Sequence, residues 1–461
     1  MDATATLAEI WTLGGLQQEA LRYAHLQGND PILPSSFAVG TAAQTSVAAA
    51  ALAACELGHV RGQPRQTVGV DMVHAALECE GWFSVDGQTP DPWDPFSGLY
   101  ACADGWVRVH ANFAHHRDGA LTLLGLSSET ARREDAQGVL RNWKALDFEQ
   151  AAADRGLVVS ALRNFSQWDV HPQALAVAAQ PLLTLERIGD ASPRALPKLH
   201  ADQLPLTGLR VLDLTRIVAG PVAARTLAAL GADVMLVNAP HLPNISVIAE
   251  SSRGKLSCHL DLRVHEHKRA MDLLLADADI FVQGYRPGGM EALGYGAQTL
   301  AERQPGIVVV SLTAYGTKGP WAPRRGFDSL VQAATGFNLA EAQAAGSALP
   351  RALPMQILDH ASGYLMAFGA AAAKVRQLQE GGSWHVRVSL AQTAHWLRSL
   401  GRVPTGFAAA APDRQAYLEN YASGFGSLVA VRPAPQLART PAHWSRPSVP
   451  PGTDAPQWPP R

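Results

Sequence analysis

The chain has 461 residues, enough for two or three domains that each bury a hydrophobic core. Its 38 basic and 40 acidic residues give a net charge of −2, which disfavours a protein that binds nucleic acid or an anionic membrane surface. The four cysteines are scattered without a CxxC spacing. They favour buried thiols in a reducing compartment over a metal site or a disulfide framework.

The sequence favours a protein that is neither secreted nor inserted in a membrane. Its first residues lack the basic start of a signal peptide. The most apolar helix expected, over residues 363–375, is too short and too rich in alanine to span a bilayer. We therefore expect a soluble cytoplasmic protein that holds no metal.

Residues 1–83 are predicted to be mainly helical. Apolar residues in 7–27 recur on one stripe, which indicates an amphipathic helix, and 41–57 form a long helix rich in alanine. A short strand over 66–70 and a helix over 72–79 follow.

Residues 84–187 are predicted to form a small α/β domain, and prolines at 90, 92 and 95 mark its boundary. Residues 98–110 indicate a β-hairpin, because Asp104-Gly105 is a strong two-residue turn signal. Residues 188–205 form a linker. The remaining elements expected here are helices over 117–125, 130–142 and 147–155 and a strand over 181–188.

Residues 206–402 alternate between strands and helices, which predicts a large domain of the Rossmann-like α/β type with a doubly wound parallel sheet. Residues 403–461 form a C-terminal extension, and its proline-rich end, 441–461, is expected to be extended or disordered. The large domain is expected to contain strands over 210–214, 233–237, 279–282 and 307–312 and helices over 221–230, 265–276 and 297–303.

The first strand of the large domain leads into a turn that could bind a ligand. Gly220 lets the backbone turn tightly, and Pro221 suits the first position of a helix, where an N–H is not needed. A helix that follows a parallel strand in this way often places its first turn against a ligand.

One stretch of the chain repeats another. Residues 359–397 can be laid on 41–79 without a gap by a shift of 318 positions (359 − 41). In each copy an alanine-rich helix leads through a breaker to a short strand and a second helix. Identities are few and mostly alanine, so the pattern leaves duplication and chance similarity both open.

A series of short motifs in the second half resembles the family III CoA-transferases, the group that includes the α-methylacyl-CoA racemases. Each motif is weak alone, but their order and spacing are specific. They are Gly208-Leu-Arg-Val-Leu-Asp-Leu-Thr-Arg216 with Ala219-Gly-Pro221, Leu230-Gly-Ala-Asp-Val234, Ser252-Arg-Gly-Lys255, Leu260-Asp-Leu262, Tyr285-Arg-Pro-Gly288, Leu293-Gly294, Tyr315-Gly316, Gly319-Pro320 and Gly326-Phe-Asp328.

The first half resembles the C-terminal part of the same family, at Tyr100–Val109 and Trp168–Ile188. The chain therefore carries the two parts of the family pattern in permuted order, over about 35–190 and about 206–400. The resemblance implies a Rossmann-like large domain with a smaller α/β domain. It also implies a homodimer.

Asp359 is the residue that the resemblance implies as the nucleophile. Read alone, an Asp before a long apolar helix is an N-cap, and a helix N-terminus would keep its carboxylate ionised at neutral pH. In the family the nucleophile attacks the thioester of an acyl-CoA, which frees CoA and leaves an acyl–aspartyl anhydride; CoA is then passed to an acceptor carboxylate. Thr41 stands at the matching position of the first copy.

The resemblance also implies where CoA binds, around the first βα turn and the ends of the next strands. The cations among these positions could pair with phosphates, although each could equally be a solvated basic residue or a packing contact. The positions are Ile217, Val218, Arg253, Lys255, Leu260, Arg263, Gly284 and Arg286.

Several residues depart from the family pattern. Asn238, Ala239 and Ala292 stand where family members commonly have charged residues, which favours a second hypothesis, a catalytically silent CoA-binding paralogue. Phe327 stands where the racemases have the histidine that moves a proton, so racemase or dehydratase chemistry is disfavoured. The expected partners are a small acyl-CoA and a carboxylic acid.

Overall fold

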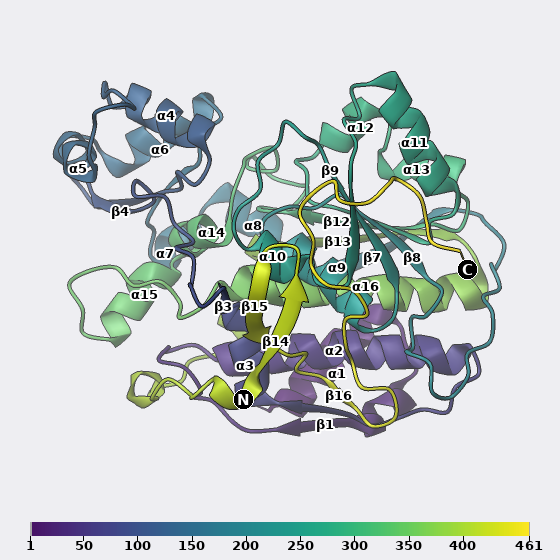
Figure 1. Cartoon of the computed structure of the whole chain (residues 1–461). Coiled ribbons are helices and arrows are strands. Elements are labelled where there is room, and N and C mark those ends of the chain that lie inside the picture. Colours follow the sequence, from purple (N-terminus) through teal and green to yellow (C-terminus); the bar gives the residue numbers. More distant parts are fainter. Residues whose placement is uncertain (1, 461) are drawn as a thin grey trace.

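The computed structural model describes residues 2–460 and is built around one seven-stranded sheet (Figure 1). The strand order is β10-β9-β8-β11-β12-β13-β7, and all neighbours are parallel except β7, which is antiparallel to β13. All the strands predicted for 206–402 lie in this sheet, which confirms the mostly parallel α/β fold. The strands are β7 (Leu183–Gly189), β8 (Arg210–Asp213), β9 (Asp233–Asn238), β10 (Lys255–His259), β11 (Ile280–Gln283), β12 (Val308–Thr313) and β13 (Ser383–Ser389).

Helices cover both faces of this sheet. Successive residues of a strand point to opposite faces, and both faces are apolar in a buried parallel sheet. Val211 faces the core formed with α9 and α16, whereas Leu212 faces the core formed with α11, α12 and α13. These helices are α9 (Ala219–Ala229), α11 (His265–Ala276), α12 (Gly289–Leu293), α13 (Ala297–Arg303) and α16 (Ile357–Glu380).

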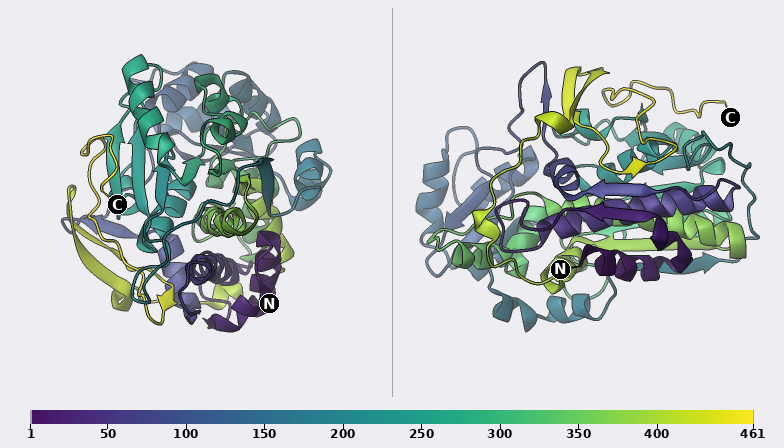
Figure 2. Two further views of the ribbon diagram at one scale, coloured as in Figure 1. Left: turned by 90° about the vertical axis from the view of Figure 1, so that its right-hand side faces the viewer. Right: turned by 90° about the horizontal axis from the view of Figure 1, so that it is seen from below.

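Two long helices rich in alanine, α2 (Val39–Val60) and α16, pack along each other (Figures 1 and 2). Their small side chains let the helix axes approach closely, and almost every residue of both helices is buried. Helix α1 (Ala3–Gly14) covers the pair from outside. The N-terminal part of the chain therefore shares one core with the large sheet.

The structure places a helix, a strand and a helix in each copy of the sequence repeat. Shifting α2, β2 (Val68–Asp71) and α3 (Met72–Glu80) by 318 positions brings them onto α16, the end of β13, and α17 (Leu390–Ser399). An aspartate from outside each long helix accepts from its first turn. Asp30, in a loop, accepts hydrogen bonds from the N–H groups of Gly40 and Thr41, and Asp328, the first residue of α14 (Asp328–Thr335), accepts one from that of Asp359. However, β2 pairs with β1 and β16 in a separate sheet.

The single helix predicted over residues 7–27 is wrong. Helix α1 ends at Gly14 because Gly15 adopts the left-handed conformation (φ 66°), and its N–H bonds to the carbonyl of Thr12. A short 3₁₀ helix (Gln18–Tyr23) and strand β1 (Ala24–Gln27) follow. The apolar spacing in the sequence continues past this glycine, although the helix ends there.

The small domain stands apart from the sheet in Figure 1 and has its own core. The predicted hairpin is confirmed as β4 (Gly98–Ala101) and β5 (Trp106–Val109), and β6 (Val159–Ala161) completes its sheet. The strand predicted over 181–188 is β7, which leaves this domain and joins the large sheet. The helices of the small domain are α4 (Ala114–Leu123), α5 (Arg133–Leu140) and α6 (Ala145–Asp154). Two further helices, α7 (Phe165–Asp169) and α8 (Pro172–Ala178), lead from it to β7.

The C-terminal extension forms the hairpin β14 (Leu418–Ser423) and β15 (Gly426–Val431), which pairs with β3 (Phe83–Val85). Beyond β16 (Gln436–Leu437), the proline-rich end is extended, as predicted, and follows the exposed edge of β10. The N–H of Asp454 donates to the carbonyl of Ser257, and the N–H of Gly254 to that of Arg446. The other elements are α10 (Ile248–Ser251), α14 (Asp328–Thr335), α15 (Phe337–Ala344) and short 3₁₀ turns at Gly406–Ala408 and Gln415–Tyr417.

Candidate functional site

A crevice of about 410 Å³ lies between the carboxyl ends of the central strands and the small domain. Leucine and threonine residues at the ends of β8 and β12 line one side, and Phe113, His115 and His116 at the start of α4 line the other. In open α/β sheets this edge is where ligands bind. None of the lining residues is acidic, and four are arginines: Arg216, Arg286, Arg324 and Arg325.

The turn after β8 has a strained backbone. Ile217 has φ 80°, a conformation that is sterically unfavourable for a β-branched residue, and Val218, with φ −126° and ψ −68°, precedes α9. Ile217 lines the crevice, whereas the side chain of Val218 is buried behind it. Strain of this kind is concentrated at functional sites, so the first turn remains a candidate ligand contact.

The turn after β11 lines the same crevice. Gly284 and Arg286 both border it, and Arg286 is exposed and forms no ion pair within residues 2–460. An adjoining hollow of about 120 Å³ is lined by Leu260 and Arg263 and shares Tyr285 with the crevice. Of the eight positions predicted to bind CoA, these two hollows thus bring together Ile217, Gly284, Arg286, Leu260 and Arg263.

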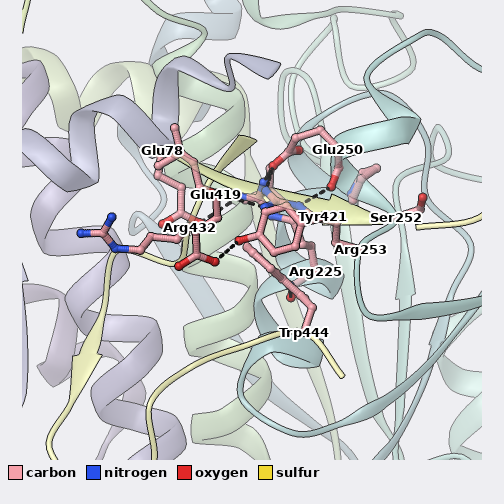
Figure 3. A network of polar contacts seen from close by, with 12 residues as sticks. Glu78, Arg225, Glu250, Ser252, Arg253, Glu419, Tyr421, Arg432 and Trp444 are labelled. Atoms are coloured by element: carbon pink, nitrogen blue, oxygen red, sulfur yellow. Dashed lines mark hydrogen bonds and ion pairs between the residues drawn. The ribbon is translucent and has the colours of Figure 1, made fainter. Parts of the chain in front are cut away.

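Arg253 does not lie at the crevice, which corrects its predicted role as a phosphate ligand. Its side chain is 1% exposed and donates to the carboxylate of Glu250 and, at 3.0 Å, to the carbonyl of Val431. The guanidinium stacks on Trp444, 3.8 Å from the ring centroid (Figure 3). Burial and the neighbouring Arg225 lower the pKa of Arg253 to about 9. Arg253 therefore holds the C-terminal segment against the large domain.

The predicted role of Lys255 as a phosphate ligand is corrected for the same reason, because its side chain is buried in an ion pair. Its ammonium is fully buried and donates to the carboxylate of Asp213 at 2.8 Å and to the carbonyl of Pro221 at 3.0 Å. Burial lowers its pKa, and Asp213 opposes that shift. The lysine links β10 to both ends of the first βα turn, and it thereby supports the turn that lines the crevice.

Asp359 is not the N-cap of α16. The helix begins at Ile357 after Gln356, which places Asp359 in the first turn, and its backbone N–H donates to the carboxylate of Asp328 at 3.0 Å. The side chain is 5% exposed, and no hydrogen bond to its carboxylate is found among residues 2–460. Burial, and then the negative charge of Asp328, raise the pKa of Asp359 well above its ordinary value.

The direction of this pKa shift opposes the expectation that the helix N-terminus stabilises the Asp359 carboxylate. Two buried carboxyl groups meet at the start of α16, so desolvation and repulsion outweigh the helix dipole. The Asp328 pKa is raised as well, chiefly by burial. This pair favours a state in which one of the two carboxyl groups holds a proton.

Phe327 connects the aspartate pair to the crevice and to the small domain. It lines the crevice directly before Asp328, and the ring of His110 stacks on it with centroids 4.0 Å apart. Burial lowers the pKa of His110 to about 3, so this imidazole is neutral at pH 7. Asp359 itself is not among the residues that line the crevice.

Sequence reasoning missed the cations of the crevice other than Arg286. Arg216 follows the first strand directly, and Arg324-Arg325 precede the Gly326-Phe-Asp328 motif, so their positions beside recognised motifs were the available signal. Their convergence depends on the packing of α4 against the strand ends.

A second crevice, of about 780 Å³, opens beside the first and shares Tyr285, Pro287 and Thr313 with it. Inside it, Ser311 and His385 are hydrogen-bonded at 2.8 Å, and the amide of Gln283 donates to the same hydroxyl at 2.8 Å. Neither Ser311 nor His385 was singled out from the sequence. Within residues 2–460 no group of three or more His, Cys, Asp or Glu side chains could hold a metal ion.

A mostly parallel sheet with a basic crevice at its carboxyl edge defines an α/β protein suited to an anionic ligand. Comparison with known sequences is more specific, because residues 206–415 match the model of CoA-transferase family III. This match spans 210 residues (206–415) of the 461 and makes that segment similar to the family.

Two curated relatives are named as acyl-CoA transferases. The chain is 28% identical over 428 residues to an acyl-CoA transferase of Gibberella moniliformis, covering 82% of this chain and 74% of that protein. It is 35% identical over 209 residues to the probable fatty acyl-CoA transferase Rv3272 of Mycobacterium tuberculosis, covering 42% of this chain. The match spans about half of that relative's length, 52%.

Among solved structures, a crystal structure of Rv3272 is similar with 35% identity and a TM-score of 0.40, over 43% of this chain and 58% of that one. No helix within residues 2–460 combines the length and the hydropathy that crossing a bilayer requires.

Proposed function

We propose that this protein is a CoA-transferase that moves CoA from an acyl-CoA to a carboxylic acid through Asp359. The observation that carries the proposal is the buried carboxyl group of Asp359, which accepts no hydrogen bond from residues 2–460, in a chain that has a basic crevice and whose residues 206–415 match CoA-transferase family III. Ile217, Gly284, Arg286, Leu260 and Arg263 are the proposed CoA contacts.

In the proposed mechanism the Asp359 carboxylate attacks the carbonyl carbon of the thioester. The C–S bond breaks, CoA leaves as thiolate, and an acyl–aspartyl anhydride forms. The thiolate attacks the aspartyl carbonyl, which releases the first acid and leaves an aspartyl–CoA thioester. The acceptor carboxylate then attacks the aspartyl–CoA thioester, which forms a second anhydride and releases CoA thiolate. The thiolate attacks the carbonyl carbon of the new acyl group, which gives the new acyl-CoA and frees the Asp359 carboxylate. Burial makes Asp359 a stronger nucleophile than a solvated carboxylate once it has lost its proton.

The test is the intact mass of the protein after mixing with a panel of acyl-CoAs, with hydroxylamine added to trap the anhydride or thioester. We expect a covalent mass that maps to Asp359. The variant Asp359→Asn keeps the size of the side chain and should show no adduct. Absence of an adduct with every donor, in protein that still binds CoA, would contradict the mechanism.

The second candidate is a catalytically silent CoA-binding paralogue. Asn238 favours it, because both side-chain amide atoms are buried without a hydrogen-bond partner where the family commonly has a charged residue. Free CoA should raise the melting temperature under either hypothesis, since both require binding. An absence of any shift at millimolar CoA would overturn both. Racemase or dehydratase chemistry is the least supported, because Phe327 cannot move a proton.

A homodimer and a cytoplasmic location belong to the same proposal. The cysteines at 55, 79, 102 and 258 are all free in the described structure, which is compatible with a reducing compartment. Light scattering on the purified protein should give twice the 49.0 kDa mass of one chain, and the mass of a single chain would contradict the dimer.

A further inference from the structure

Three polar side chains meet inside the second crevice, which is not part of the proposed CoA site. Gln283 of β11, Ser311 of β12 and His385 of β13 all line it, and none of them lines the first crevice. Gln283 and Ser311 are direct partners in their pair of strands, and His385 is the partner of Val309, two positions before Ser311. Because residues two apart on a strand share a face, the sheet holds the three side chains on one face.

The hydrogen bonds of this cluster have a definite direction. The side-chain oxygen of Gln283 accepts from the backbone N–H of Tyr285 at 2.7 Å, so its amide nitrogen is the atom that faces Ser311. That nitrogen donates to the Ser311 hydroxyl oxygen at 2.8 Å. The other partner of this hydroxyl within residues 2–460 is the Nε2 atom of His385, also at 2.8 Å, so the hydroxyl donates its hydrogen to that nitrogen.

His385 is in the state that can accept a proton. Burial, together with the charge of Arg387, lowers its pKa to about 4 against the opposing charge of Glu186, so the imidazole is neutral at pH 7. Glu186 stands opposite His385 on β7, and its hydrogen bond from Arg387 keeps its own pKa below the ordinary value. A carboxylate at this position stabilises the imidazolium that forms when His385 takes up a proton.

This arrangement is that of a nucleophile and its general base. The hydroxyl donates to a neutral imidazole, a second donor holds the hydroxyl in place, and the pair borders a crevice of about 780 Å³ that has room for a small substrate. The three groups come from adjacent strands of one sheet, and strands hold such groups more precisely than loops do.

We propose that Ser311 is the nucleophile of a second active site, which hydrolyses an ester of a carboxylic acid with His385 as general base. Ser311 Oγ attacks the carbonyl carbon, and its proton passes to Nε2 of His385. The bond from that carbon to the alcohol oxygen breaks, and the alcohol leaves with the proton from Nε2. Water then attacks the acyl-serine and gives a proton to His385, which returns it to Ser311 as the acid leaves. One ester and one water become one acid and one alcohol.

The experiment uses the purified full chain without CoA. It measures hydrolysis of p-nitrophenyl butyrate, and the intact mass after treatment with diisopropyl fluorophosphate, which labels activated serines. We expect hydrolysis above the buffer rate and one phosphoryl adduct that maps to Ser311. Ser311→Ala should abolish the adduct, and both Ser311→Ala and His385→Gln should lower kcat/KM by about 100-fold or more, because nucleophile or base is lost.

Ser128→Ala, at an exposed position of the small domain, is the control and should leave both readings unchanged. The adduct on wild-type protein tests the site even where a variant does not fold. An adduct on another serine, hydrolysis that persists in Ser311→Ala, or wild-type protein that neither hydrolyses the ester nor takes up the label would overturn the proposal. Ser311 and His385 would then form a structural hydrogen bond only. The site uses neither Asp359 nor CoA, so these readings are independent of the proposed CoA transfer.

Discussion

At the residue scale, two carboxyl groups meet at the start of α16. Asp359 and Asp328 are buried together, and both pKa values are raised, chiefly by desolvation. The sequence placed Asp359 at the start of the long helix, but the helix-dipole argument left out the burial and the second carboxyl group that raise its pKa. The second carboxyl group comes from the start of α14, 31 positions earlier, and its proximity could not be read from local spacing.

The first prediction concerns the pH dependence of transfer. Asp328→Asn removes a like charge beside Asp359, so the pKa of Asp359 should fall. Because the nucleophile must be ionised, the acidic limb of the pH profile of kcat/KM should move to lower pH. Steady-state kinetics across pH 4–9 would measure it, with Asp202→Asn, an exposed carboxylate in the linker 188–205, as the control. An unmoved limb would show that Asp328 does not influence the nucleophile.

The second prediction concerns stability. The folded-state pKa of Asp359 lies above that of the unfolded chain, so the folded state binds more protons and its stability falls as pH rises above the ordinary carboxyl range. Asp359→Asn removes this loss and should raise the free energy of unfolding at pH 7, with little difference at pH 4. Urea titrations at both pH values would test it. A variant less stable than wild type at pH 7 would contradict the direction.

At the element scale, close helix packing holds α16 against the first βα turn. Gly363 lies one turn after Asp359, and a Cβ atom there would come within 2.5 Å of the carbonyl oxygen of Ala219. That contact is with backbone, which cannot move aside without shifting α9. The lack of a side chain at Gly363 therefore lets α16 approach the strained turn at Ile217.

The third prediction uses this contact. Gly363→Ala should destabilise the protein by about 1–3 kcal/mol through overpacking, and it should lower transfer activity because the βα turn shifts. Gly138→Ala is the matched control, since Gly138 lies in helix α5 with open space around it; it should stabilise by about 0.5–1 kcal/mol. Urea denaturation measures both. Equal behaviour of the two variants would show that α16 and α9 are not in tight contact.

At the scale of the whole molecule, the C-terminal segment joins parts of the chain that are distant in sequence. Trp444 stacks on Arg253 and donates its indole N–H to the carbonyl of Arg225 at 3.1 Å. Arg225 is itself buried between Glu78 of α3 and Glu250 of α10 (Figure 3). The extension thereby covers a charge network between the N-terminal repeat and the large domain.

The fourth prediction tests this cover. Trp444→Ala exposes the Arg253 guanidinium and should cost about 2 kcal/mol, the value for a desolvated cation–π contact. His443→Ala, at an exposed position beside it, should be neutral. Thermal unfolding gives both values, and an unchanged melting temperature for Trp444→Ala would mean that the segment is not held at this point.

The sequence by itself predicted strands β8, β9, β11 and β12, though not β10, and helices α9, α11 and α13, because the apolar pattern of each of these elements is a local property. It also determined the family motifs and the position of Asp359. Tertiary structure decided the rest. Arg253 and Lys255 proved to be buried in ion pairs, the Asp359 pKa proved to be raised, and Arg216 and Arg325 met in one crevice. Each outcome depends on neighbours that lie far apart along the chain, and electrostatic energies follow distance in space rather than distance in sequence.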